Sequence, residues 1–324
     1  GRIKTFCIPN MINNLFDLVL DELSRRWKVH HKPRSKRAFR CECDSPVFFR
    51  NSQCLNCQAQ LGYAPALGDL RALKSGNTPE SWRPVGDDVE GDYRRCANFH
   101  SPAGCNWLVP IDEAEKLCLS CRLNRLIPNL ENEANRRYWR VIELGKRRLI
   151  SQLLALGLPI VPKSQDPNRG LAFNLLRSPE SGPRVMTVHA SGLITINIAE
   201  ADDAIREKIR TELHEPYRTL LGHLRHEIGH YYWDRLISNS RWLEPYRTLF
   251  GDERADYAAA IKANYEKGAP SDWAERHISA YASSHSWEDW AETWAHYLHI
   301  IYSLDTAIAH GLDAEDLEID IKPF

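Results

Sequence analysis

The sequence predicts an α+β fold in which a cysteine-rich region precedes a small sheet and a series of helices. Two observations lead to this prediction. All nine cysteines lie before residue 122, and eight of them form two sets of four. Beyond them the hydrophobic pattern changes from one long helical stretch to short strands and then back to helices, as expected of an α+β chain.

The first part of the chain, residues 1–37, is predicted to be a basic arm. Residues 1–40 carry ten Lys or Arg against three Asp or Glu, although the net charge of the whole chain is only −1. A charge run of this kind is typical of a solvated segment, and it leaves open an anionic partner such as nucleic acid. Residues 11–20 are weakly apolar but too polar and short for a membrane span or signal peptide, so we expect a short helix and a cytoplasmic protein with no membrane partner.

Residues 38–127 are predicted to form a zinc-ribbon region with two four-cysteine sites. Two close pairs of cysteines on two turns fit a tetrahedral zinc with four thiolate ligands, and cytosolic chains seldom keep disulfides. The first set is Cys41, Cys43, Cys54 and Cys57. The second, less regular set is Cys96, Cys105, Cys118 and Cys121, in which His100 can replace one member. We expect two structural zinc ions that supply folding energy, and Cys7 is left unpaired.

Residues 128–324 are predicted to form a mainly helical domain with a small sheet. A helical pattern runs from Glu131 to Leu156 and ends at Gly157. Three strand-like runs follow, with a hairpin turn at 190–192 between the second and third: Leu171–Leu176, Val185–His189 and Leu193–Ile198. Beyond them we expect helices at about 200–212, 217–237, 252–267 and 285–309. The hexapeptide Glu-Pro-Tyr-Arg-Thr-Leu occurs at 215–220 and 244–249, which we interpret as two similar helix entries.

The pattern HExxH at residues 226–230 predicts a catalytic zinc site. On a helix, His226 and His230 lie one turn apart on the same face and can bind one ion. Glu227 is rotated by about 100° and can act as general base on a water whose pKa the metal lowers. The pattern fixes only three positions. One side of the helix is apolar (Leu220, Leu224 and Ile228), as expected of an active-site helix that packs on the core. Gly229 costs about 1 kcal/mol in a helix, which suggests that something approaches the backbone there.

A catalytic zinc needs a third protein ligand, and two downstream stretches offer one. In the nearer stretch the candidates are Asp252 and Glu253. In the farther stretch Glu288 can bind zinc while Glu292, one turn later, accepts the second N–H of a zinc histidine. For the outer contacts to the histidines, Asp256 and Asp234 are further candidates, and the remaining histidines are assigned no role, among them His223, His285, His296 and His299.

The stretch Tyr281-x6-Glu288-x-x-Ala291-Glu292 resembles the gluzincin active site of lethal-factor-like and Pro-Pro endopeptidases. This resemblance implies Glu288 as third ligand and Tyr281 as hydroxyl donor to the developing oxyanion. We therefore favour Glu288 over Asp252 and Glu253. Residues 38–310 as a whole resemble bacterial zinc-binding metallopeptidases with an N-terminal zinc-ribbon domain. The shared stretches are Arg-His-Glu-Ile-Gly-His-Tyr-Tyr-Trp, Gly-Asp-Glu-Arg-Ala-Asp-Tyr and Trp-Glu-Asp-Trp-Ala-Glu-Thr-Trp-Ala-His-Tyr-Leu-His. The resemblance implies a zincin-type metallopeptidase domain at 128–324.

We therefore predict a zinc metallopeptidase with one catalytic and two structural zinc ions, acting on a peptide or protein. An extended peptide is expected to pair with residues 193–198 as an edge strand. Two alternatives stay open. One is a nucleic-acid-associated protein, similar to the Spartan-type proteases that act on DNA-crosslinked proteins, although their zinc module usually follows the protease domain. The other is a zinc scaffold without catalysis.

Overall fold

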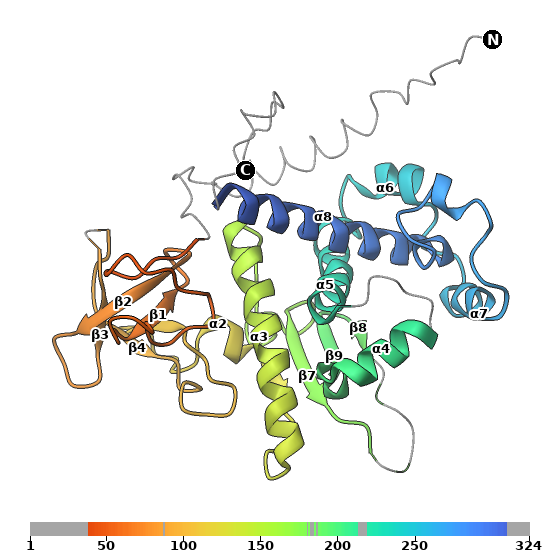
Figure 1. Ribbon diagram of the computed structural model, residues 1–324. Coiled ribbons are helices and arrows are strands. Elements are labelled where there is room, and N and C mark those ends of the chain that lie inside the picture. The colour runs from red at the N-terminus through yellow and green to blue at the C-terminus, as the bar shows by residue number, and fades with distance from the viewer. Residues whose placement is uncertain are drawn as a thin grey trace, which may run out of the picture.

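The computed structural model describes residues 38–86, 88–179, 181, 185, 187–212 and 219–309. The basic arm, Cys7 and residues 215–218 of the first hexapeptide lie outside this part of the chain. Within it the predicted α+β fold is confirmed: a region with two four-cysteine clusters and small sheets comes first, and helices dominate the C-terminal part (Figure 1).

An antiparallel five-stranded sheet in the order β1-β2-β3-β4-β5 forms the cysteine-rich region. Its strands are short: β1 Leu61–Ala64, β2 Asp69–Ser75, β3 Trp82–Pro84, β4 Tyr93–Arg95 and β5 Leu108–Pro110. A short helix, α2 (Leu119–Arg122), carries Cys121 and follows Cys118 directly. All eight described cysteines are free thiols, so they form no disulfides with one another.

The long helix α3 (Glu133–Ala155) stands between this region and the second sheet (Figure 1). Its Lys146 ammonium lies 2.7 Å from the Glu143 carboxylate, and both side chains are 0% exposed. Asn124 donates to the same carboxylate at 2.8 Å, and Arg147 donates to the carbonyl of Ala103 at 3.2 Å. Buried charges need such partners, and the buried apolar residues of α3 and of the cysteine-rich region belong to one hydrophobic core.

The second sheet has the order β6-β7-β9-β8. Its strands are β6 Asn124–Leu126, β7 Ala172–Leu176, β8 Val188–Ala190 and β9 Leu193–Asn197. β6 and β7 pair in parallel, as do β7 and β9, whereas β8 is antiparallel to β9. The predicted division at residue 127 stays a prediction, and β6, on its N-terminal side, pairs with β7.

The predicted hairpin is present, but the predicted edge strand was wrong. Ser191 and Gly192 have φ of 47° and 81°, as a tight turn between β8 and β9 requires. A side chain at Gly192 would come within 2.2 Å of the Gly170 carbonyl oxygen, so only glycine fits there. β9 is paired on both sides, by β7 and β8, and therefore has no free edge. The sheet order, which is not sequential, makes β8 the edge next to the helices.

The C-terminal part of the described chain is mainly helical. Its helices are α4 Asp203–Glu212, α5 Leu220–Leu236, α6 Leu243–Phe250, α7 Tyr257–Lys267 and α8 Ser286–Ala309, with 3₁₀ turns η1 Ile198–Ala201, η2 Trp273–Glu275 and η3 Ala282–Ser284. α5 packs against both α3 and α8. The prediction had no range for α6, although the second hexapeptide falls within it, and Pro245 sits in its first turn as expected. It also began α7 five residues early.

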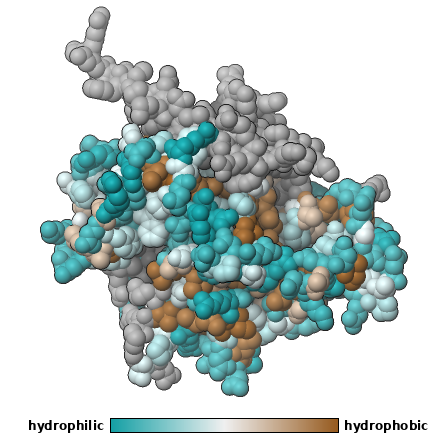
Figure 2. Space-filling model, turned by 180° about the vertical axis from the view of Figure 1, so that it is seen from behind, coloured by the Kyte–Doolittle hydropathy of each residue, from teal (hydrophilic) through white to brown (hydrophobic). Residues whose placement is uncertain are grey.

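Within the part of the chain that the structure describes, each helix is too short or too polar to span a bilayer. Seen from behind, apolar residues gather in several patches that polar residues separate (Figure 2).

Candidate active site

Helix α5 presents the two histidines of HExxH from a buried face. Thr219 caps the helix by accepting a hydrogen bond from the Gly222 amide at 2.9 Å, which sets where the helix begins. Gly229 lets α8 approach, because a side chain there would meet Ala291 Cα at 3.1 Å. The Trp290 indole N–H donates to the Gly229 carbonyl at 2.9 Å. The close approach predicted at Gly229 is therefore made by α8, which carries the acidic residues of the site.

Three ligand atoms converge between α5 and α8. The Nε2 atoms of His226 and His230 lie 2.9 and 3.7 Å from Oε2 of Glu288. The ligand atoms of these three residues all lie within 4.8 Å of one another. Glu288 is 1% exposed, and its buried Oε2 has no aligned hydrogen-bond donor among the residues that the structure describes. A buried, unsatisfied carboxylate oxygen facing two imidazoles fits a zinc ion with two histidine ligands and one carboxylate ligand.

The outer contacts of His226 also suit a ligand. Its Nδ1 lies 2.6 Å from Oε1 of Glu292, and Oε2 of Glu292 accepts from the Ser279 hydroxyl at 2.8 Å. Such contacts fix the ring orientation and the tautomer that leaves Nε2 for a metal. The structure thus places Glu292 where the sequence placed it. Nδ1 of His230 is buried and has no hydrogen-bond partner in the described chain.

The charges at this point favour a cation. Burial would raise the pKa of Glu288, but the contact with His226 and the charge of His230 lower it to about 2, so the carboxylate is ionised. Burial lowers the pKa of His230 and favours its neutral form. For His226 burial acts to lower the pKa, yet Glu288 and Glu292 raise it well above the ordinary value. Two carboxylates therefore share one imidazole, a surplus of negative charge that a divalent ion offsets.

Glu227, the predicted general base, is buried beside the histidines. Its Oε1 lies 3.2 Å from Nε2 of His223, one helical turn earlier. Burial would raise the pKa of Glu227, but the hydrogen bond and charge of His223 lower it, together with the charges of His226 and His230. Glu227 is thus held as a carboxylate, the form that can accept a proton.

Two tyrosines approach the convergent ligands, and the sequence predicted only one. The ring of Tyr281 lies 6.1 Å from that of His226, measured between centroids, just before η3. The hydroxyl of Tyr257 donates to Oε1 of Glu288 at 2.7 Å. Tyr257 lies 31 residues from its partner, at the start of α7. Only its place in the stretch shared with the resembling family pointed to it.

We expect Tyr257→Phe to weaken zinc binding by about tenfold while leaving the fold intact. The hydroxyl orients the Glu288 carboxylate, and losing such an outer contact typically costs 10- to 100-fold in metal affinity. Competition with a chromogenic chelator measures this affinity. Tyr265→Phe, on the exposed part of the same helix, is the matched control. Equal zinc affinity in both variants would contradict the role given to Tyr257.

Among the described contacts, the other predicted acids make none with His226 or His230. Asp256 caps α7 by accepting from the Ala259 amide at 3.0 Å and is exposed, so its expected contact with a zinc histidine is corrected to a helix cap. Asp252 pairs with Arg254 at 2.8 Å and Glu253 with Arg247 at 2.5 Å. Asp234 lies 4.0 Å from His189, and its pKa is raised by burial.

The two cysteine sets form two compact clusters. Within each, the four sulfur atoms lie within 4.8 Å of one another. Cys41 and Cys57 are 3.6 Å apart, and Cys105 and Cys118 are 3.7 Å apart, measured between sulfurs. Four thiolates at 2.3 Å around one tetrahedral zinc would be about 3.8 Å apart, so the spacing suits zinc. His100, weighed as a replacement ligand, is exposed and packs on Phe99, outside the cluster.

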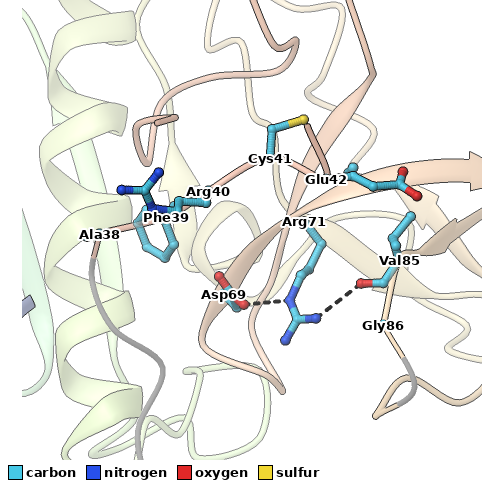
Figure 3. Close-up of a pocket in the computed structure, with 10 residues that line it drawn as sticks. Ala38, Phe39, Arg40, Cys41, Glu42, Asp69, Arg71, Val85 and Gly86 are labelled. Carbon is cyan, nitrogen blue, oxygen red and sulfur yellow. Dashed lines mark hydrogen bonds and ion pairs between the residues drawn. The ribbon is translucent and has the colours of Figure 1, made fainter. Parts of the chain in front are cut away.

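A pocket of the described chain lies in the cysteine-rich region (Figure 3). Its volume is about 470 Å³, and Phe39, Cys41 and Val85 are among its lining residues. The Arg71 guanidinium lies across it and donates to Asp69 and to the Val85 carbonyl. None of the convergent residues of α5 and α8 lines this pocket, so it is separate from the candidate site.

Comparison with known proteins gives two family matches. Residues 135–323 match the family described as "Putative zinc-binding metallo-peptidase", and residues 38–132 match a zinc-ribbon domain. Similar proteins include uncharacterized proteins of Mycobacterium bovis and Mycobacterium tuberculosis. Each is 47% identical over 278 residues, which is 85% of this chain and 76% of the relative. No solved structure matches the chain significantly.

Proposed function

Because the chain belongs to the zinc-binding metallo-peptidase family, we propose that it hydrolyses peptide bonds with a zinc ion held by His226, His230 and Glu288. The observation that carries this proposal is the convergence of three buried ligand atoms within 4.8 Å, next to an ionised Glu227. Zinc, when bound, lowers the pKa of a water to about 7 and polarises a carbonyl. The rest of the chemistry falls to the side chains.

Glu227 acts as general base and then as general acid. Its carboxylate takes a proton from the attacking water and delivers it to the amine that leaves when the peptide bond breaks. Tyr281 donates its hydroxyl to the oxyanion of the tetrahedral intermediate, a task that its position beside His226 supports. Glu292, through Nδ1 of His226, and Tyr257, through Glu288, hold two of the ligands in place.

The substrate is a peptide or protein bound in extended form along the free edge of β8. This strand contacts α5, and among the described strands it pairs with β9 alone, so its other side is the edge of the sheet. Backbone hydrogen bonds to such an edge align a peptide without regard to its sequence. His189, in the middle of β8, stacks on His230 with 6.1 Å between ring centroids. The edge strand therefore lies beside a residue that we propose as a zinc ligand.

The two cysteine clusters each hold a structural zinc in this proposal, giving three ions per chain. The buried cluster of Cys96, Cys105, Cys118 and Cys121 and the half-exposed cluster of Cys41, Cys43, Cys54 and Cys57 both suit four thiolate ligands. No observation in the described residues favours nucleic acid as a partner. The zinc scaffold without catalysis predicts two ions per chain and no cleavage.

A peptide-library assay on the zinc-loaded protein tests the proposal. We expect cleavage, about three zinc ions per chain by mass spectrometry, loss of cleavage with a chelator, and recovery when zinc is added back. Circular dichroism during chelation shows whether the fold survives, because chelators also unfold zinc-dependent domains. A zinc-loaded, folded protein that leaves every library peptide intact would refute the peptidase function.

A further inference from the structure

A partly buried histidine, with 15% of its side chain exposed, lies next to the proposed general base. His223 lies on α5 four residues before Glu227, so the two side chains share one face of the helix. Its Nε2 lies 3.2 Å from Oε1 of Glu227, and its Nδ1 lies 2.6 Å from Oε2 of Glu200. Both carboxylates are buried, with exposed fractions of 4% for Glu227 and 3% for Glu200.

Glu200 is itself fixed from the sheet side of the molecule. It lies on η1, directly after β9, and its Oε1 accepts from the Thr187 hydroxyl at 2.5 Å. The Arg206 guanidinium donates to the Glu200 backbone carbonyl at 2.9 Å, which anchors η1 to α4. The Glu200 carboxylate, itself held by Thr187, thus contacts Nδ1 of His223, while Nε2 of His223 faces Glu227.

We propose that His223 is a positioning residue that holds the Glu227 carboxylate for proton transfer, and that Glu200 fixes the imidazole from behind. The contact engages Oε1 of Glu227 and assigns proton transfer to Oε2. A carboxylate with one oxygen fixed loses rotational freedom, which keeps the reacting oxygen in place. Carboxylates at both ring nitrogens favour the protonated imidazolium, whose Nδ1–H donates to Glu200 and whose Nε2–H donates to Glu227. Glu200 also fixes the orientation of the ring. The inference rests on the proposed peptidase function.

The experiment compares His223→Leu and His223→Gln with the wild type, all zinc-loaded. Leucine fills much of the space but has no donor, whereas the glutamine amide can reach the position of Nε2. We expect His223→Leu to lower kcat by about 10- to 100-fold with KM and zinc content unchanged, and His223→Gln to recover most of the activity. His299→Leu is the matched control, because it makes the same substitution at a histidine that contacts α5 through Arg225.

A second variant and a structural measurement keep the test independent of folding and of activity. Glu200→Gln keeps the volume at η1 but removes the charge, and we expect it to lower kcat about tenfold. This variant replaces His223→Leu in the test if His223→Leu does not fold. Crystal structures of the zinc-loaded variants show where the Glu227 carboxylate lies. We expect it to be displaced with leucine at position 223 and to keep its place with glutamine.

The outcomes separate this inference from the proposed function. Unchanged kcat in His223→Leu, or a loss that follows lost zinc in both variants, overturns the positioning role. If the wild type cleaves no peptide, the proposed function fails, and the crystal structures decide alone. A displaced Glu227 in His223→Leu then supports positioning, and an undisplaced one overturns it.

Discussion

Glu227→Gln is expected to lower kcat by about 10²- to 10⁴-fold, the usual contribution of a general base. The substitution keeps the shape of the side chain, and its amide oxygen can still accept from His223. It removes the carboxylate that takes a proton from water. Because Glu227 is not one of the three convergent ligands, zinc content and thermal stability should stay close to those of the wild type. Steady-state kinetics on a cleaved library peptide, with zinc measured by mass spectrometry, test this expectation.

Glu207→Gln is the matched control for this prediction. Glu207 lies on α4, is half exposed and pairs with Arg210 at 2.8 Å, so the same chemical change occurs at a residue with no role in the proposed proton transfer. Its kinetics should match those of the wild type. Equal activity in Glu227→Gln and the wild type would reject Glu227 as the general base, and another group would have to activate the water.

Cys105→Ser is expected to unfold most of the cysteine-rich region. Cys105 is fully buried in a cluster whose four members are all buried. A serine there leaves a poor zinc ligand and a buried hydroxyl. Binding of a structural zinc contributes about 10–16 kcal/mol, comparable with the whole stability of a typical domain. Zinc content should fall by one ion, and the urea midpoint of unfolding should fall sharply.

Cys57→Ser provides the comparison within the same region. Cys57 is exposed and belongs to the cluster with two exposed members. Its loss should also remove one zinc, but with a smaller fall in the urea midpoint, because fewer core contacts depend on that cluster. Equal destabilisation by the two variants would mean that burial of the second cluster adds nothing to its structural importance.

Local patterns made much of this structure predictable. The helix at 131–156 is present as α3 (Glu133–Ala155), because its periodic apolar residues and the following Gly157 act within the segment itself. The cysteine spacing led to two clusters that the structure assembles. The residues of HExxH and the acidic pair on α8 come together as the sequence suggested. The roles of His226, His230 and Glu288 as zinc ligands stay a prediction.

What could not be predicted depends on contacts between distant segments. The order of strands in a sheet is set by packing, so the sequence did not reveal that β9 is central and β8 is the edge. Tyr257 and Glu200 meet their partners across 31 and 23 residues, where no local periodicity operates. Asp256 was misplaced for the same reason, since an acid before a helix fits a cap as readily as a histidine partner.

The contacts between α3 and the cysteine-rich region have a consequence for the protein during its synthesis. The ribosome releases the cysteine-rich region first, yet buried partners of Asn124 and of the Ala103 carbonyl lie on α3. Until Glu143, Lys146 and Arg147 leave the ribosomal exit tunnel, the cysteine-rich region cannot make these buried contacts with α3. Metal binding at the buried cysteines should therefore become stable only after about residue 147 has left the ribosome. This happens before β7 is released.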